Sequence, residues 1–124
     1  MEVLNWLIGP QLIGLIFIAA AAIQKRYPPK EINALYGYRT KLSMSNQQNW
    51  DEGNRYSTRL LLKCGQILLL TGIFITPLMQ HISNVNVRMI ISVSMIVSGA
   101  ITTVVLLHYL TERHLKTTFI NKTE

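Results

Sequence analysis

The sequence predicts an all-α integral membrane protein, with three transmembrane helices and a structured cytoplasmic loop between the first two. Three stretches carry no Asp, Glu, Lys or Arg: residues 3–24, 64–87 and 89–111, which are 22, 24 and 23 residues long. An apolar helix needs about 20 residues to cross the hydrocarbon layer, so each stretch is long enough. Helices of a soluble domain would show one apolar stripe, whereas these stretches are apolar on nearly every face. We therefore expect a single membrane domain over residues 1–124.

The basic residues predict how the chain is oriented. Of the twelve Lys and Arg residues, eight lie between Lys25 and Lys63, three follow the third stretch, and one, Arg88, lies between the second and third. Short loops rich in Lys and Arg stay on the cytoplasmic side, so we expect the N-terminus outside and the connector and C-terminus inside. The formal net charge of +6 then favours contact with membrane lipids. It does not indicate direct nucleic acid binding.

The first transmembrane helix is expected at about residues 3–24. A cleaved signal peptide would carry positive charge before its apolar run, whereas only Glu2 precedes this one. We therefore interpret the stretch as a retained anchor. Gly9 and Pro10 should end or bend the helix near its outer end. Pro28 and the proline after it then end the helix, because proline disfavours helical geometry in the residue before it.

The connector, about residues 25–59, should lead by a helix into the second span, about residues 60–79. Ser45 followed by Gln48 has the form of a capping box, so this helix should begin there, and Gly53 allows a kink in it. One face of the helix can pack on protein and consists of Trp50, Asn54, Ser57 and Leu61. The other face begins at Asp51 and suits lipid headgroups through Arg55, Arg59 and Lys63.

Small residues predict how the spans pack. The third span, about residues 89–111, precedes a cytoplasmic tail over residues 112–124 and carries Ser94, Ser98 and Thr102, with Gly99 and Thr103 beside them. The second span carries Gly65, Gly72 and Thr76. Such residues let helices approach closely. We interpret both sets as packing seams within one three-helix bundle, and a homodimer or other homo-oligomer seam is the alternative use.

Catalytic signals are weak. No carboxylate lies inside a span, which argues against a proton-coupled carrier. His108 and His114 are six residues apart and point to roughly opposite sides of a helix, so they could not share a metal ion without other ligands. Cys64 is the only cysteine, and a glycine-rich phosphate loop is absent. We expect a protein that is not an enzyme, with no catalytic residue, no metal site and no cofactor.

The connector holds an unusual combination of polar and aromatic residues, which we regard as the candidate site. Anchoring at lipid headgroups would explain the aromatic and basic members. It does not explain the Asn, Ser and Thr residues, which add hydrogen-bond donors and acceptors. We expect a loop that folds back under the bundle, with Arg39 over aromatic rings. The set, called the signature residues below, comprises Asn33, Tyr36, Gly37, Tyr38, Arg39, Thr40, Ser43, Asn46, Trp50 and Asn54.

The signature residues resemble the SdpI family of small bacterial membrane proteins, whose pattern is approximately N-x-x-Y-G-Y-R-T, then S, N, W and an A-N pair. Residues 33–54 match it in register, with Gly53 where the family often has alanine. The resemblance covers nearly the whole chain, although the better-known members carry an additional membrane half in front of this region. It implies a multi-pass protein of the bacterial cytoplasmic (inner) membrane. It also implies immunity to a secreted peptide toxin, coupled in the prototype to a cytoplasmic repressor held at the bilayer.

Three functional hypotheses remain open. In the first, the chain is an immunity and signalling protein that meets a peptide toxin and on which a cytoplasmic regulatory protein docks through Arg39, Trp50 and the basic stripe. In the second, it is a structural or accessory subunit of a membrane or envelope complex. The third is a membrane enzyme that holds a lipid headgroup with Tyr36 and Arg39. We rank the third last, because no base or nucleophile with a poised partner accompanies them.

Overall fold

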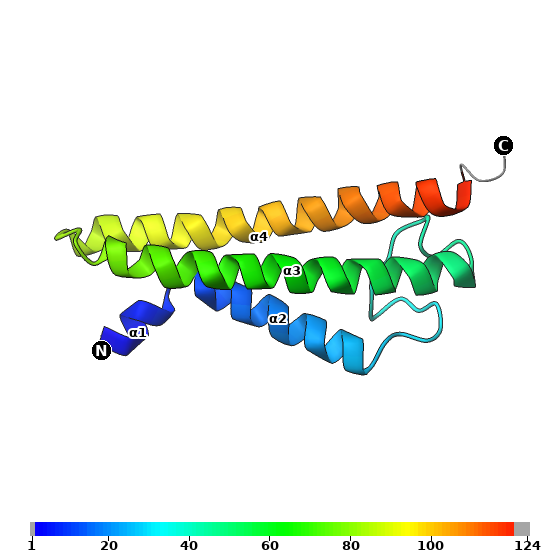
Figure 1. Cartoon of the computed structure of the whole chain (residues 1–124), viewed down its shortest axis with the longest axis horizontal. Helices are drawn as coiled ribbons and strands as arrows, with labels where there is room; N and C mark the ends of the chain where they lie inside the picture. The colour runs from blue at the N-terminus through cyan, green and yellow to red at the C-terminus, as the bar shows by residue number, and fades with distance from the viewer. Residues whose placement is uncertain (1, 121–124) are drawn as a thin grey trace.

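The computed structural model describes residues 2–120. Helices α3 and α4 run antiparallel along most of the molecule, while α2 crosses α3 obliquely and diverges from it toward the end that carries the loop (Figure 1). Within the described residues the chain is helical without strands, so the predicted all-α class is confirmed. The elements are α1 (Glu2–Leu7), α2 (Pro10–Arg26), α3 (Gln47–Met79), α4 (Val85–Leu115) and a π-helical turn, η1 (Lys116–Ile120).

The first apolar stretch is not one continuous helix. Helix α1 ends at Leu7 and α2 begins at Pro10, with Gly9 between them in an extended conformation. Proline suits the first turn of a helix because its missing N–H would have no partner there. Helix α2 has 17 residues and is about 25 Å long, and in the described part of the chain only α3 and α4 with its η1 extension have the length and apolar character of a full span. The single helix expected over residues 3–24 is therefore corrected to two helices that meet at the predicted Gly-Pro bend.

Helix α3 begins close to the predicted position but has a different cap. Asn46 is the N-cap residue, and its Oδ1 accepts a 2.8 Å hydrogen bond from the backbone N of Asn49. Ser45 instead donates its hydroxyl to the carbonyl oxygen of Leu42. The capping box predicted at Ser45 is therefore wrong, because asparagine caps at least as well as serine and stands one residue later. From this cap the helix runs on unbroken through Gly53 and into the apolar segment.

Helix α3 is long enough to cross a bilayer and to extend well beyond it. Residues 60–79 would cover about 30 Å, and residues 47–59 add about 20 Å outside the hydrocarbon layer. Helix α4 likewise continues past the expected end of its span to Leu115, and η1 follows. The tail expected over residues 112–124 is thus helical as far as it is described, and residues 121–124 lie outside the described part.

Glycines let α2 and α3 touch through their backbones. A Cβ atom added at Gly14 would lie 2.5 Å from the backbone N of Leu69 and 2.7 Å from the carbonyl oxygen of Gly65. One turn away, the buried Oε1 of Gln11 accepts a 3.0 Å hydrogen bond from the hydroxyl of Thr76. The packing seam predicted on α3 is therefore confirmed, since its members are all buried: Gly65, Gly72 and Thr76.

The small residues of α4 form the predicted seam only in part. Ser94, Ser98 and Thr102 are exposed, and the two serine hydroxyls donate to carbonyl oxygens of their own helix. Of the predicted set, Thr103 is buried and Gly99 is half-buried against Leu68, and the face that they share also carries the buried Ser92, which was not predicted. A four-residue repeat reveals that a stripe exists. The rotation of the helix about its axis decides which stripe faces the bundle.

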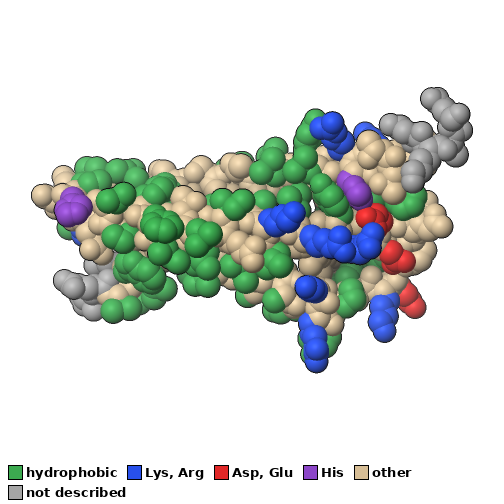
Figure 2. Space-filling model, viewed as in Figure 1, with side chains coloured by type: hydrophobic (Ala, Val, Ile, Leu, Met, Phe, Trp, Pro, Cys, Tyr) green, Lys and Arg blue, Asp and Glu red, His purple; other side chains and the backbone are tan. Residues whose placement is uncertain are grey.

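Large apolar side chains cover the outside of the helices. Phe74 is 71% exposed, Ile90 is 65% exposed and Ile67 is 63% exposed. Figure 2 shows hydrophobic side chains along the helices, with Lys, Arg, Asp and Glu gathered toward the end that carries the loop. Soluble monomers rarely expose contiguous apolar surface of this extent, whereas lipid matches it. The fold is that of a membrane protein.

Candidate functional site

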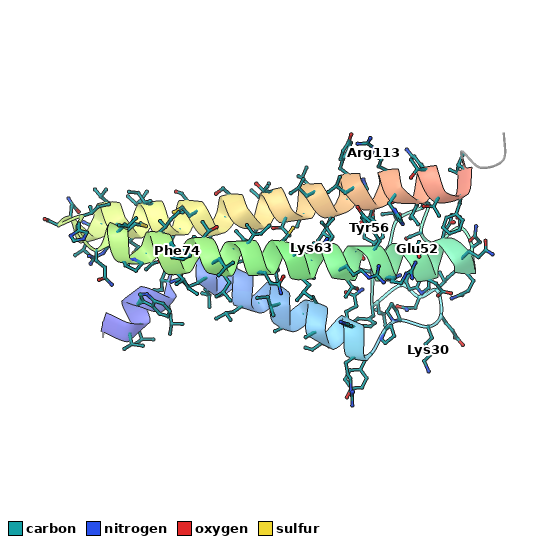
Figure 3. All side chains as sticks on the ribbon, viewed as in Figure 1. Lys30, Glu52, Tyr56, Lys63, Phe74 and Arg113 are labelled. Carbon is teal, nitrogen blue, oxygen red and sulfur yellow. The ribbon has the colours of Figure 1, made fainter. Side chains whose placement is uncertain are left out.

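The folded loop, residues 27–46, connects α2 to α3 and lies against the first turns of α3 and the last turns of α4 (Figure 1). Figure 3 shows the side chains of this end of the molecule, where Lys30, Glu52 and Arg113 are labelled. All signature residues belong either to the folded loop or to the first eight residues of α3. The structure therefore brings the predicted site residues into one region.

Asn33 shapes the start of the folded loop. Its Oδ1 accepts hydrogen bonds from the backbone N atoms of Leu35 and Tyr36, at 3.0 and 2.8 Å, and its Nδ2 donates to the carbonyl oxygen of Glu31 at 2.9 Å. In such an Asx-turn the asparagine side chain replaces backbone partners. The hydroxyl of Tyr36 then donates to the carbonyl oxygen of Tyr27 at 2.9 Å. Both signature side chains thus stabilise the geometry of the loop itself.

Asn54 holds the folded loop against two helices. Its Oδ1 accepts from the backbone N of Tyr38 at 2.6 Å and from Nε2 of Gln24 at 3.2 Å, and its Nδ2 donates to the carbonyl oxygen of Trp50 at 2.9 Å. Gly37, beside Tyr38, has a φ of 105°, and a Cβ there would collide with Oδ1 of Asn54. Glycine is therefore needed at this turn both for its backbone conformation and for space.

Trp50 is fully buried beneath the folded loop. Its side chain is 0% exposed, and its Nε1 donates a 2.9 Å hydrogen bond to the carbonyl oxygen of Pro29. A buried indole with a satisfied N–H contributes strongly to packing. Trp50 is therefore a packing residue of the folded loop, and docking of a regulator on it stays a prediction that would require the loop to open.

A carboxylate at the end of α4 fastens the folded loop from the other side. Oε1 of Glu112 accepts hydrogen bonds from the hydroxyls of Thr40 and Tyr38, at 2.6 and 2.9 Å. Burial and the hydrogen bond to Glu112 raise the pKa of Tyr38 well above its usual range. Glu112 was not among the residues predicted from the sequence. Its position directly after an uncharged stretch is a signal that could have found it.

Ser43 closes the last turn of the folded loop. Its hydroxyl is wholly buried, donates to the carbonyl oxygen of Tyr38 at 3.0 Å and accepts from the backbone N of Thr40 at 2.8 Å. Asn49, which the sequence analysis did not select, fixes the same region because its Nδ2 donates to the carbonyl oxygen of Leu42 at 3.1 Å. Anchoring at lipid headgroups would not require Ser43 or Asn49, and their hydrogen bonds within the folded loop explain why both are present.

A second contact between α3 and α4 was also missed. Oε1 of Glu52 lies 2.8 Å from Nε2 of His114, and its Oε2 accepts from Nε of Arg55 at 2.9 Å. The His114 ring stacks on Tyr56 with centroids 4.2 Å apart. Burial alone would raise the pKa of the Glu52 carboxyl, but hydrogen bonds from His114 and Arg55 outweigh it and hold that pKa below its usual value. The contact between Glu52 and His114 could not be predicted from the sequence, because the two residues lie 62 positions apart.

The accessible part of the signature is small. Arg39 was expected to lie over aromatic rings, but its guanidinium donates instead to the carbonyl oxygen of Ala34. Leu35 is 91% exposed and Tyr36 is 39% exposed. We call the exposed residues Leu35, Tyr36 and Arg39 the loop tip. The tip contains the most exposed large apolar side chain of the folded loop, Leu35.

The first half of α3 has the two faces that the sequence predicts. Trp50, Asn54 and Ser57 are buried, whereas the basic residues on the opposite side are exposed. Contact of these basic residues with lipid headgroups stays a prediction. They are Arg55, Arg59 and Lys63. Among residues 2–120, no three His, Cys, Asp or Glu side chains come together as a group that could hold a metal ion.

These features define a class: a small all-helical membrane protein whose helices are tied together at one end by an internally hydrogen-bonded loop. A family model described as the SdpI/YfhL protein family matches residues 30–110. The chain belongs to this family, so the predicted resemblance is confirmed. It is 47% identical over 62 residues to a protein of Bacillus subtilis (strain 168) named "Uncharacterized protein YfhL", and the match covers 50% of this chain and 56% of that protein. No solved structure matches the chain.

Proposed function

We propose that the chain is a multi-pass protein of the bacterial cytoplasmic membrane that confers immunity to a secreted peptide toxin, holds a cytoplasmic regulator at the bilayer, or does both. In this arrangement α1 with α2, then α3 and then α4 make three crossings, with the N-terminus outside and the folded loop and C-terminus inside. Membership of the SdpI/YfhL family supports the proposal. The concentration of basic residues between Lys25 and Lys63 and after the third span supports the orientation.

One observation favours docking through the loop tip. The signature residues Ser43, Trp50 and Asn54 are occupied by internal hydrogen bonds and form a braced scaffold. The same scaffold holds Leu35 almost fully exposed beside Arg39. An apolar side chain on a loop that is already ordered can anchor a partner, because little conformational entropy of the loop is lost on binding. The loop tip is therefore the surface that we assign to a partner.

We infer a role without catalysis. The polar groups of the signature are engaged in the fold, and the loop tip combines one leucine, one tyrosine and one arginine without a paired nucleophile and base. Docking uses shape and charge alone, so it needs no cofactor. This inference also lowers the rank of a lipid-headgroup enzyme built on Tyr36 and Arg39.

The test uses cells that lack the chain and are complemented with wild type or variants, then mixed with parent cells that secrete their own toxins. We expect Leu35→Asp and Arg39→Ala to lower survival at unchanged membrane abundance, because both alter the loop tip without opening its scaffold. Lys41→Ala is the matched control, since Lys41 is an exposed basic residue of the same loop. Trp50→Ala is unsuitable, because its burial makes loss of folding the expected result. Wild-type survival in both loop-tip variants would overturn the docking role.

A second candidate is a structural or accessory subunit of a membrane or envelope complex. The exposed stripe of Ser94, Ser98 and Thr102 on α4 favours it, because small residues allow another transmembrane helix to approach closely. The wild-type chain should then purify in mild detergent with a stoichiometric integral partner or with a second copy of itself. Ser98→Leu should release that partner. A wild-type chain that purifies alone would exclude this candidate.

A further inference from the structure

A groove of about 720 Å³ opens where α2 and α3 diverge. Figure 1 shows α2 leaving α3 at this end, and Figure 2 shows Lys and Arg side chains gathered there. This size suits a ligand site, because small-molecule pockets typically enclose about 300–1,000 Å³. The groove combines an apolar floor with a basic rim, and the residues that matter most are Ala21, Ala22, Leu62, Lys25, Lys30 and Arg59.

The rim is strongly positive. Lys25, Lys30 and Arg59 form no ion pair with any residue of the described chain, whereas Arg55, which also lines the groove, pairs with Glu52. Asp51 is the one acidic side chain of the lining, and it accepts a 2.8 Å hydrogen bond from Nε2 of Gln47. Three unpaired cations around one concave surface complement an anion.

Both walls of the groove change from apolar to basic in the same direction. On α2, Ala21 and Ala22 lie about one turn before Lys25, and Lys25 is nearer the loop. On α3, Leu62 lies about one turn from Arg59, again with the basic residue nearer the loop. An amphiphile that entered sideways from the bilayer would therefore meet apolar surface at the depth of its chains and positive charge at the depth of its headgroup.

From this arrangement we infer that the groove binds one anionic phospholipid. Its phosphate contacts Lys25 and Arg59, with Lys30 at the outer rim, and one acyl chain lies over Ala22 and Leu62. The occupant is an individual lipid in a defined site, distinct from the general attraction of basic residues to a membrane surface. The inference requires membrane residence and is independent of the immunity role.

Lipid in this groove would also brace the folded loop. Pro29 and Asn54 line the groove, and the same two residues hold Trp50 and Tyr38 through hydrogen bonds. A ligand that binds only the folded arrangement stabilises it by mass action. We therefore expect bound lipid to protect the folded loop as well as the ends of α2 and α3.

The test uses the full chain purified in dodecyl maltoside, with native mass spectrometry and thermal unfolding as readouts. Phosphatidylglycerol should remain bound at one molecule per chain and raise the unfolding midpoint, while phosphatidylcholine should do neither. The double variant Lys25→Gln/Arg59→Gln should bind phosphatidylglycerol about tenfold or more weakly, because two charge-assisted phosphate contacts are lost. Ala22→Trp should abolish retention without a change of charge, since it fills the exposed apolar floor.

The matched control is Lys41→Gln/Lys116→Gln, which removes the same charge from exposed residues that do not line the groove. This double variant should retain the lipid as wild type does. Equal loss in the two double variants, or equal retention of phosphatidylcholine and phosphatidylglycerol, would overturn the inference. Glycerol 3-phosphate is the headgroup probe without acyl chains. If it raised the unfolding midpoint as much as the lipid, a free phosphate ester would be the ligand and the lipid assignment would be wrong.

Discussion

Asn54 is the side chain through which the folded loop is joined to two helices. Replacing it with alanine leaves the Tyr38 N–H and the Gln24 amide without their shared acceptor at a site where Asn54 is only 4% exposed. An unpaired buried polar group costs about 1–3 kcal/mol. We expect Asn54→Ala to lower the thermal unfolding midpoint of the purified chain and to accelerate amide exchange at Tyr38. Asn86→Ala, at an exposed asparagine of α4, is the control, and an equal effect there would contradict the prediction.

The Glu52 carboxylate makes the contact between α3 and α4 sensitive to acid. Because its pKa in the folded chain is below the value of about 4.3 for an unfolded glutamate, its contribution to stability is complete above that value and is lost as the pH falls through the folded pKa. The thermal unfolding midpoint should therefore decrease as the pH is lowered below about 4.3. Glu52→Gln should remove part of this slope. Glu31→Gln, at an exposed loop position, should leave the slope unchanged. Identical slopes in all three proteins would count against the role of Glu52.

At the scale of helices, the α2–α3 crossing depends on backbone contact at glycine. A Cβ at Gly14 would meet main-chain atoms of Leu69 and Gly65, which cannot move aside without separating the helices. We expect Gly14→Ala to destabilise the chain in detergent by about 1–3 kcal/mol, the usual cost of overpacking. Gly99→Ala is the matched control, because its Cβ would meet only the end of the flexible Leu68 side chain, 2.9 Å away. Equal unfolding midpoints for the two variants would show that the crossing tolerates separation.

The packing faces of the helices were predicted from the sequence with different success. The two faces of the first half of α3 were predicted correctly except for Leu61, which is only half-buried, because helical side chains recur at fixed angular intervals wherever the helix begins. The packing face of α4 was predicted only in part, because adjacent stripes of small residues occur on that helix. Contact with α3 decides that Thr103 is buried together with Ser92, while Ser98 and Thr102 stay exposed. The break before Pro10 was placed correctly.

For the whole molecule, the orientation in the membrane is the decisive prediction. In a chain carrying Cys64→Ser, a cysteine introduced at Leu35 or Ser83 reports on the folded loop or on the turn between α3 and α4. A membrane-impermeant maleimide added to intact cells should label Ser83→Cys and should label Leu35→Cys only after the cells are permeabilised. The reason is that the loop side carries most of the Lys and Arg residues, which are retained in the cytoplasm. Labelling of Leu35→Cys in intact cells would reverse the topology and remove the cytoplasmic docking role.

By itself, the sequence determined the features that depend on neighbouring residues: the all-helical membrane class, the uncharged segments, the bend at Gly9 and Pro10, and the location of the signature. These features follow from hydrophobicity, proline geometry and charge, which act over one or two helical turns. Only the tertiary structure decided that the signature is mostly internal, that Glu112 and His114 fasten the loop end of the molecule, and that α2 and α3 part to form a basic groove. Those outcomes depend on contacts between residues that are far apart along the chain, and their partners are set by how the helices pack.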